Sequence, residues 1–138
     1  MKQAAKEHDV KEHTSDLPKI LVADDDLEIL RLVEAALKPI GATVITASNG
    51  EEALERILTE KPTLVILDVI MPGLTGWEVA KYIRGHPEYR HVRILMVTGI
   101  GEDINQATSP IMGADDFVSK PFTFEDLANR VRRLLPAS

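Results

Sequence analysis

From Lys19 onward, short apolar runs alternate with stretches in which apolar residues recur at helical spacing. The apolar runs predict five strands, at about 19–23, 42–47, 63–67, 92–97 and 115–118. The amphipathic stretches predict helices at about 26–38, 50–60, 76–84, 102–111 and 123–135. Strands that alternate with helices in this way are typical of βα units on a parallel sheet. The pattern therefore predicts one α/β domain.

Several helix boundaries carry their own signals. Asp26 is a suitable N-cap for the first helix, and Pro39 to Gly41 end it. Thr123, followed by acidic residues, opens the last helix. Pro110 falls inside the expected fourth helix and should end or kink it early.

Polar groups follow four of the predicted strands, at the point where each strand ends. Asp24 and Asp25 follow the first strand, Asp68 the third, Thr98 the fourth and Lys120 the fifth. Ligands bind to folds of this kind at the carboxyl ends of the strands. We therefore expect these side chains to share one cleft.

The chemistry of this set suits a divalent metal and a phosphoryl group. Mg²⁺ takes six oxygens in octahedral geometry, and Asp24, Asp25, Asp68 and the main-chain carbonyl of Ile70 could supply several of them. Without a cation, two carboxylates about 4 Å apart repel by about 4 kcal/mol at an effective dielectric constant of about 20. Such repulsion either raises the pKa of an acid or favours metal binding.

Two further groups complete the expected site. Lys120 offers a compact cation that neutralises a phosphate or pairs with Asp68. Thr98 offers a hydroxyl to a phosphoryl oxygen, and its location allows it to point toward the phosphate or away from it.

Composition narrows the class of protein. The chain has 138 residues, of which 44% are apolar and 28% charged, and it has no cysteine and a net charge of −6. Residues 1–18 are polar without apolar periodicity, so we expect a flexible extension followed by one domain over 19–137. The acidic balance does not support direct nucleic-acid binding. No apolar stretch approaches the roughly 20 residues that span a bilayer, so we expect no membrane contact and a cytoplasmic location.

These features together resemble the receiver domain of bacterial response regulators. The resemblance rests on the acid pair, Asp68 with Met71-Pro72 and Gly76 after it, Thr98, and Lys120-Pro121-Phe122, and it covers about residues 19–135. It implies a flavodoxin-like three-layer α/β sandwich with a five-stranded parallel sheet in the order 2-1-3-4-5 and five helices.

The resemblance also implies roles for the acids. Asp68 would be the phosphoacceptor of a two-component phosphorelay, taking a phosphoryl group from a histidine kinase or a phosphotransfer protein as an acyl phosphate. Asp25, Asp68 and the Ile70 carbonyl would bind Mg²⁺ directly, while Asp24 would act mostly through water.

The remaining implied roles concern switching. Thr98 and Lys120 would hold the phosphoryl oxygens, and Thr98 and Phe117 would form the switch. The Lys120–Pro121 peptide bond would be cis. The switch would act on a downstream protein target or an output domain, and the resemblance also suggests a homodimer through helix 4, strand 5 and helix 5.

Two other readings fit parts of the sequence. Asp24 and Asp26, one residue apart, resemble the nucleophile and acid of haloacid-dehalogenase-type phosphatases, although that family needs a further acidic pair where this chain has Thr98 to Gly101. A binding module that is never phosphorylated is the other alternative. We favour a signalling phosphoacceptor, which is not an enzyme beyond self-catalysed phosphotransfer and slow loss of its own phosphate.

Two residues bear on how long the phosphorylated state lasts. Water that attacks the aspartyl phosphate would be oriented by side chains two positions beyond Asp68 and Thr98. These are Ile70 and Ile100, which cannot hydrogen-bond to water. We therefore expect slow self-hydrolysis. At Thr75, before Gly76, the family often has Asp or Asn, so we expect altered capping of the loop there.

Overall fold

A computed structural model of the chain describes residues 17–99 and 113–136. Five strands form a single parallel sheet in the order β2-β1-β3-β4-β5, which confirms the predicted topology. The strands are β1 (Lys19–Ala23), β2 (Thr43–Ala47), β3 (Leu64–Asp68), β4 (Arg93–Thr98) and β5 (Asp116–Ser119).

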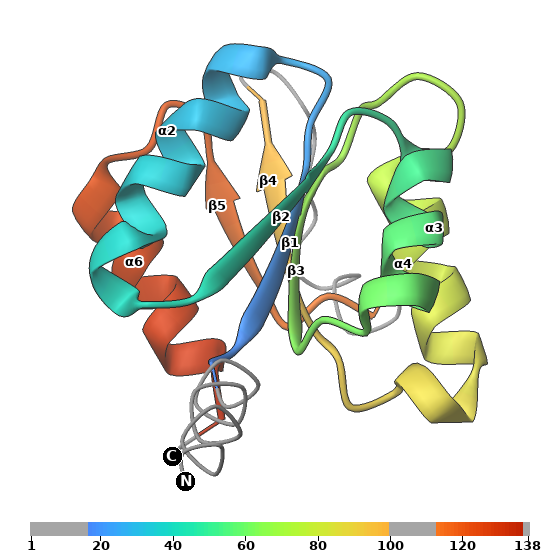
Figure 1. Ribbon diagram of the computed structural model, residues 1–138. Coiled ribbons are helices and arrows are strands. Elements are labelled where there is room, and N and C mark those ends of the chain that lie inside the picture. The colour runs from blue at the N-terminus through green and yellow to red at the C-terminus, as the bar shows by residue number, and fades with distance from the viewer. Residues whose placement is uncertain (1–16, 100–112, 137–138) are drawn as a thin grey trace, which may run out of the picture.

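Helices cover both faces of this sheet (Figure 1). α2 and α6 lie on one face, and α3 and α4 lie on the other. Their bounds are α2 (Leu27–Leu37), α3 (Gly50–Glu60), α4 (Gly76–Gly85) and α6 (Phe124–Leu134), and the short 3₁₀ helices are η1 (Lys38–Ile40) and η2 (Pro87–Tyr89). Four of the predicted helices are thereby confirmed. The helix expected at 102–111, with Pro110, lies outside the described residues, as does nearly all of the polar extension.

Helix caps follow from the local sequence. Asp26 caps α2 as predicted, because its carboxylate accepts a hydrogen bond from the Glu28 backbone N–H at 2.9 Å. Thr75 begins α4 with a capping box: its hydroxyl accepts from the backbone N–H of Glu78, whose carboxylate accepts from that of Thr75. Threonine therefore serves as the cap at this position, where the family often has Asp or Asn.

The sheet is buried from both sides, as parallel sheets are. Alternate strand residues contribute to two apolar clusters, one against α3 and α4 and the other against α2 and α6. All five residues of β3 are buried, including Asp68 at its end. An acid at that place is held by a strand that cannot shift without disturbing both clusters.

Strand register sets the positions of the expected site residues. Ala23 of β1 pairs with Leu67 of β3, and Asp68 pairs with Val97 of β4. Thr98, which ends β4, pairs with Ser119 of β5. The residues that follow β1 and β5 therefore emerge beside Asp68, at the carboxyl edge of the sheet.

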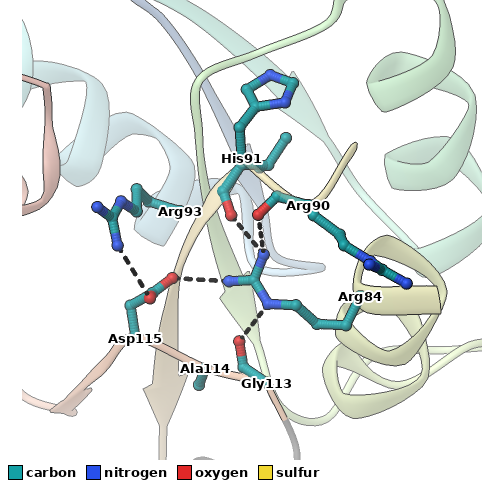
Figure 2. Close-up of a pocket in the computed structure, with 8 residues that line it drawn as sticks. Arg84, Arg90, His91, Arg93, Gly113, Ala114 and Asp115 are labelled. Carbon is teal, nitrogen blue, oxygen red and sulfur yellow. Dashed lines mark hydrogen bonds and ion pairs between the residues drawn. The ribbon is translucent and has the colours of Figure 1, made fainter. Parts of the chain in front are cut away.

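At the opposite end of the strands, the side chain of Arg84 connects α4 to the sheet (Figure 2). Its guanidinium donates to the carbonyls of Gly113 (2.9 Å), Arg90 (3.1 Å) and Val92 (2.7 Å), and to a carboxylate oxygen of Asp115 (2.8 Å). Arg84 therefore links α4 to the segments that enter β4 and β5.

This cluster lines a pocket of about 680 Å³ to which Arg90, His91 and Arg93 also contribute. Figure 2 shows these three side chains pointing in different directions rather than converging on one point. Arg84 makes four donor contacts within the protein, so the residues around this pocket serve to connect α4 to the sheet. It lies at the other end of the strands from Asp68.

None of the helices in the described part of the chain is long and apolar enough to cross a membrane.

Replacing Arg84 tests the connection between α4 and the sheet. Arg84→Met should lower the free energy of unfolding by about 2–3 kcal/mol, because carbonyl groups and a carboxylate lose a charged donor. Arg93→Met is the matched control: Arg93 contacts the same Asp115 at 3.4 Å, but its side chain is 56% exposed. It should cost less than about 1 kcal/mol. Urea unfolding of both variants measures the difference, and equal losses would contradict the assignment.

Candidate functional site

Three carboxylates converge at the carboxyl edge of the sheet. One oxygen each of Asp24, Asp25 and Asp68 lies within 4.8 Å of the others. Asp24 is 2% exposed and Asp68 5% exposed, whereas Asp25 faces solvent. The predicted convergence is confirmed, and the cluster has a buried side and an open side.

The acidic run after β1 divides into different roles. The Asp24 backbone N–H donates to the carbonyl of Ala47 at 3.1 Å, and its Oδ1 accepts from the Asp26 backbone N–H at 2.9 Å. Asp26 turns its own carboxylate to the start of α2. Asp24 and Asp25 thus belong to the site, and Asp26 belongs to the helix cap.

Lys120 reaches the cluster from the end of β5. Its Nζ lies 3.1 Å from Asp24 Oδ2 and 3.6 Å from Asp68 Oδ2. The Lys120 backbone N–H donates to the carbonyl of Thr98 at 2.7 Å, and the Lys120–Pro121 peptide bond is cis, as the resemblance implied. The ammonium is therefore placed between two acids by the chain that leaves β5.

Thr98 and Phe117 occupy neighbouring strands. Thr98 is buried, and its hydroxyl donates to Ser119 Oγ at 3.3 Å. The ring of Phe117 meets Trp77 of α4 edge-on, with ring centres 5.9 Å apart and planes at 62°. Trp77 packs against the core. Ser119 was not among the predicted site residues, although it too is a polar residue at the end of a strand.

Burial and charge act in opposite directions on the site's ionisable groups. Burial raises the pKa of Asp24 above its ordinary value of 3.8, although the Asp26 N–H and Lys120 pull it down. Burial lowers the pKa of Lys120, but Asp24 and Asp68 together raise it above its ordinary value. The pKa values of both partners in this ion pair thus rise. We attribute the raised pKa of Asp24 to its deep burial, which outweighs its pairing with Lys120. Lys120 therefore stays charged, and Asp24 holds its negative charge at a cost.

The donor set fits Mg²⁺. The three carboxylates offer hard oxygen atoms, and the exposure of Asp25 leaves room for the waters that Mg²⁺ retains. With Lys120 counted, the group has a net charge of about −2 when all its acids are ionised, which a divalent cation would neutralise. Among the described residues, Asp24, Asp25 and Asp68 are the side chains that could hold such a cation.

Comparison with known proteins gives a consistent result. The family model of the response regulator receiver domain matches residues 20–132. The probable transcriptional regulator ycf27 of Porphyra purpurea is 47% identical over 117 residues, which cover 85% of this chain and 47% of that protein. The alkaline phosphatase synthesis transcriptional regulatory protein PhoP of Bacillus subtilis is 42% identical over 120 residues, which cover 87% and 49%. The chain spans about half the length of these curated relatives.

Solved structures agree with the sequence relatives. A putative response regulator from Chloroflexus aurantiacus is similar with a TM-score of 0.80 and 34% identity, covering 86% of this chain and 98% of that one. The chemotaxis response regulator CheY4 of Vibrio cholerae is similar with a TM-score of 0.79 and 33% identity, covering 86% and 99%.

Replacing Asp24 tests the charge balance of the site. Because the pKa of Asp24 is raised by folding, the contribution of Asp24 to the free energy of unfolding falls as the pH rises from 3.8 through its folded-state pKa. At neutral pH, Asp24→Asn should therefore raise the unfolding temperature in EDTA. It should also reduce the further rise that Mg²⁺ gives the wild type.

Asp26→Asn is the control for this prediction. Asparagine caps a helix as well as aspartate does, and Asp26 directs its carboxylate to α2. This variant should match the wild type in both conditions. A lower unfolding temperature for Asp24→Asn in EDTA, measured by thermal denaturation, would show that the buried acid is net stabilising.

Proposed function

The chain belongs to the response regulator receiver domain family, and on that premise we propose that Asp68 is its phosphoacceptor. The chain is the receiver domain of a two-component signalling protein, whose partner is a histidine kinase. The observation that carries the proposal is the position of Asp68: it ends a fully buried strand, 3.6 Å from the ammonium of Lys120 and within the acid cluster.

The proposed reaction transfers a phosphoryl group between side chains. A carboxylate oxygen of Asp68 attacks the phosphorus of a phosphohistidine on the kinase or on a phosphotransfer protein. The P–N bond breaks as the P–O bond forms, the imidazole leaves with the electron pair, and Asp68 becomes an acyl phosphate. Lys120 neutralises charge on the phosphoryl oxygens, and the Thr98 hydroxyl turns from Ser119 to donate to one of them.

The metal part of the proposal assigns Mg²⁺ to Asp25, Asp68 and the carbonyl of Ile70, with Asp24 acting through water. Bound Mg²⁺ would neutralise charge between the acids and the incoming phosphoryl oxygens. Lys120 partly offsets the charge of the two buried acids, at 3.1 and 3.6 Å.

The switch is proposed to consist of Thr98 and Phe117. Movement of the Thr98 hydroxyl toward the phosphoryl group frees space near β5, where Phe117 lies against Trp77. The output would be a protein target, a homodimer through helix 4, strand 5 and helix 5, or an output domain in a longer protein. The names of the relatives, which are transcriptional regulators, favour an output domain that controls transcription.

The proposal also covers class and location. We take the chain to be a signalling phosphoacceptor in the cytoplasm rather than an enzyme with steady turnover. The capping role of Asp26 supports this view over a phosphatase that would use Asp24 and Asp26.

Labelling tests the phosphoacceptor. Incubated with acetyl phosphate and Mg²⁺, the wild type should gain the mass of one phosphoryl group, and Asp68→Asn should gain none, because the amide is not a nucleophile. Asp26→Asn should be labelled like the wild type. Intact-protein mass spectrometry reads all three, and labelling of Asp68→Asn would refute the assignment. Continuous phosphate release from phosphomonoesters would instead favour the phosphatase.

The lifetime of the phosphorylated state gives another test. The Ile70 side chain is 59% exposed next to Asp68 and cannot hydrogen-bond to an attacking water. Ile100 lies outside the described residues. Ile70→Asn should release phosphate severalfold faster than the wild type, while Leu58→Asn, an equivalent change on the exposed side of α3, should not. Equal or slower release by Ile70→Asn would end the hypothesis.

A further inference from the structure

The loop between β3 and α4, residues 69–75, carries the Ile70 carbonyl and is held at its two ends. The Val69 backbone N–H donates to the carbonyl of Val97 at 3.0 Å, and the Gly76 backbone N–H donates to the carbonyl of Val69 at 2.9 Å. The Ile70 side chain itself is largely exposed, so its packing does not fix the carbonyl. Met71, the next residue, is buried in the core and holds one side of this peptide, and the rest of the loop holds the other.

The far half of the loop lies against the first turn of α3. Gly50, the first residue of that helix, is buried, and a Cβ atom placed on it would overlap the carbonyl oxygen of Leu74 and lie 2.5 Å from Leu74 Cβ. The obstructing oxygen belongs to the backbone, so a side-chain rotation could not relieve the contact. Any larger residue at position 50 would push the loop away from α3.

A neighbouring contact joins the same two segments. Gly73 adopts a φ of +76°, and a Cβ atom on it would overlap the carboxylate of Glu51, with Oε2 at 2.6 Å. The α3 turn that receives the loop is firmly built. Asn49 caps it by accepting from the Glu52 N–H at 2.7 Å, and Ala53 in the following turn is fully buried. The loop thus closes against a fixed surface.

We propose that Gly50 is a positioning residue for the magnesium site: the missing side chain lets Leu74 approach α3, and this approach sets where the Ile70 carbonyl stands beside Asp68. The inference rests on the proposed function, in which that carbonyl is a metal ligand. Mg²⁺ demands nearly regular octahedral geometry, whereas Ca²⁺ accepts longer and less regular coordination. A displaced carbonyl therefore weakens Mg²⁺ binding more than Ca²⁺ binding.

The test compares Gly50→Ala with Gly85→Ala. Both glycines lie at helix ends outside the left-handed region, but a Cβ on Gly85 meets nothing within 4 Å. Calorimetric titration should show Mg²⁺ affinity about tenfold weaker in Gly50→Ala, as expected when a ligand loses its support. The affinity for Ca²⁺ should fall by a smaller factor, and Gly85→Ala should match the wild type for both ions.

A general loss of structure would give a different result. Alanine is not a poorer helix former than glycine, so intrinsic helix propensity does not account for weaker Mg²⁺ binding. The unfolding temperature in EDTA shows whether each variant is folded. If Gly50→Ala does not fold, Leu74→Ala, which removes the packing of this loop residue against the apolar core without creating an overlap, should show the same preferential loss of Mg²⁺ affinity.

The outcomes separate this inference from the proposed function. Equal Mg²⁺ affinity in Gly50→Ala and Gly85→Ala, or equal losses for Mg²⁺ and Ca²⁺, would overturn the role of Gly50. A wild type that binds no Mg²⁺ and takes no phosphoryl group would instead overturn the proposed function.

Discussion

Crowding of negative charge at one edge of the sheet is the constraint around which this structure is arranged. Asp24 and Asp68 are almost inaccessible to water, and Asp25 lies close to both. The ammonium of Lys120 offsets part of this charge from contacts of 3.1 and 3.6 Å. The arrangement persists because each acid is fixed by backbone that serves the core: β3 is buried along its whole length, and Asp24 follows directly on buried β1. A site with this balance has a physical reason to take up a small divalent cation.

Much of this could be anticipated from the residues themselves. Apolar runs that end in Asp68, Thr98 and Lys120 predict both the strands and the edge at which these residues meet, because parallel strands all point the same way. The strand order was implied by the resemblance, and the register then confirmed it. Asp26 was predicted as a cap, and its carboxylate is engaged in that way.

Other features depend on distances that periodicity does not encode. Nothing in the pattern showed that Ser119 would receive the Thr98 hydroxyl, or that Lys120 would lie nearer to Asp24 than to Asp68. The close approach of Gly50 to Leu74 joins segments far apart in the chain, and a glycine at a helix start has several ordinary explanations. The capping box at Thr75 depends on the carboxylate of Glu78, which accepts a hydrogen bond from the Thr75 backbone N–H. The prediction for this loop considered only the residue at position 75, where the family often has Asp or Asn.

The edge-on contact between Trp77 and Phe117 has a practical consequence. Trp77 is the single tryptophan of the chain, and its indole lies 5.9 Å from the ring proposed to move. Tryptophan emission from the unlabelled protein therefore comes from one place, beside the ring that is proposed to move. Its wavelength and intensity follow the polarity and the quenching groups around that indole. The domain thus carries an intrinsic optical probe beside Phe117, and stopped-flow fluorescence can follow a rearrangement of that ring without any attached dye.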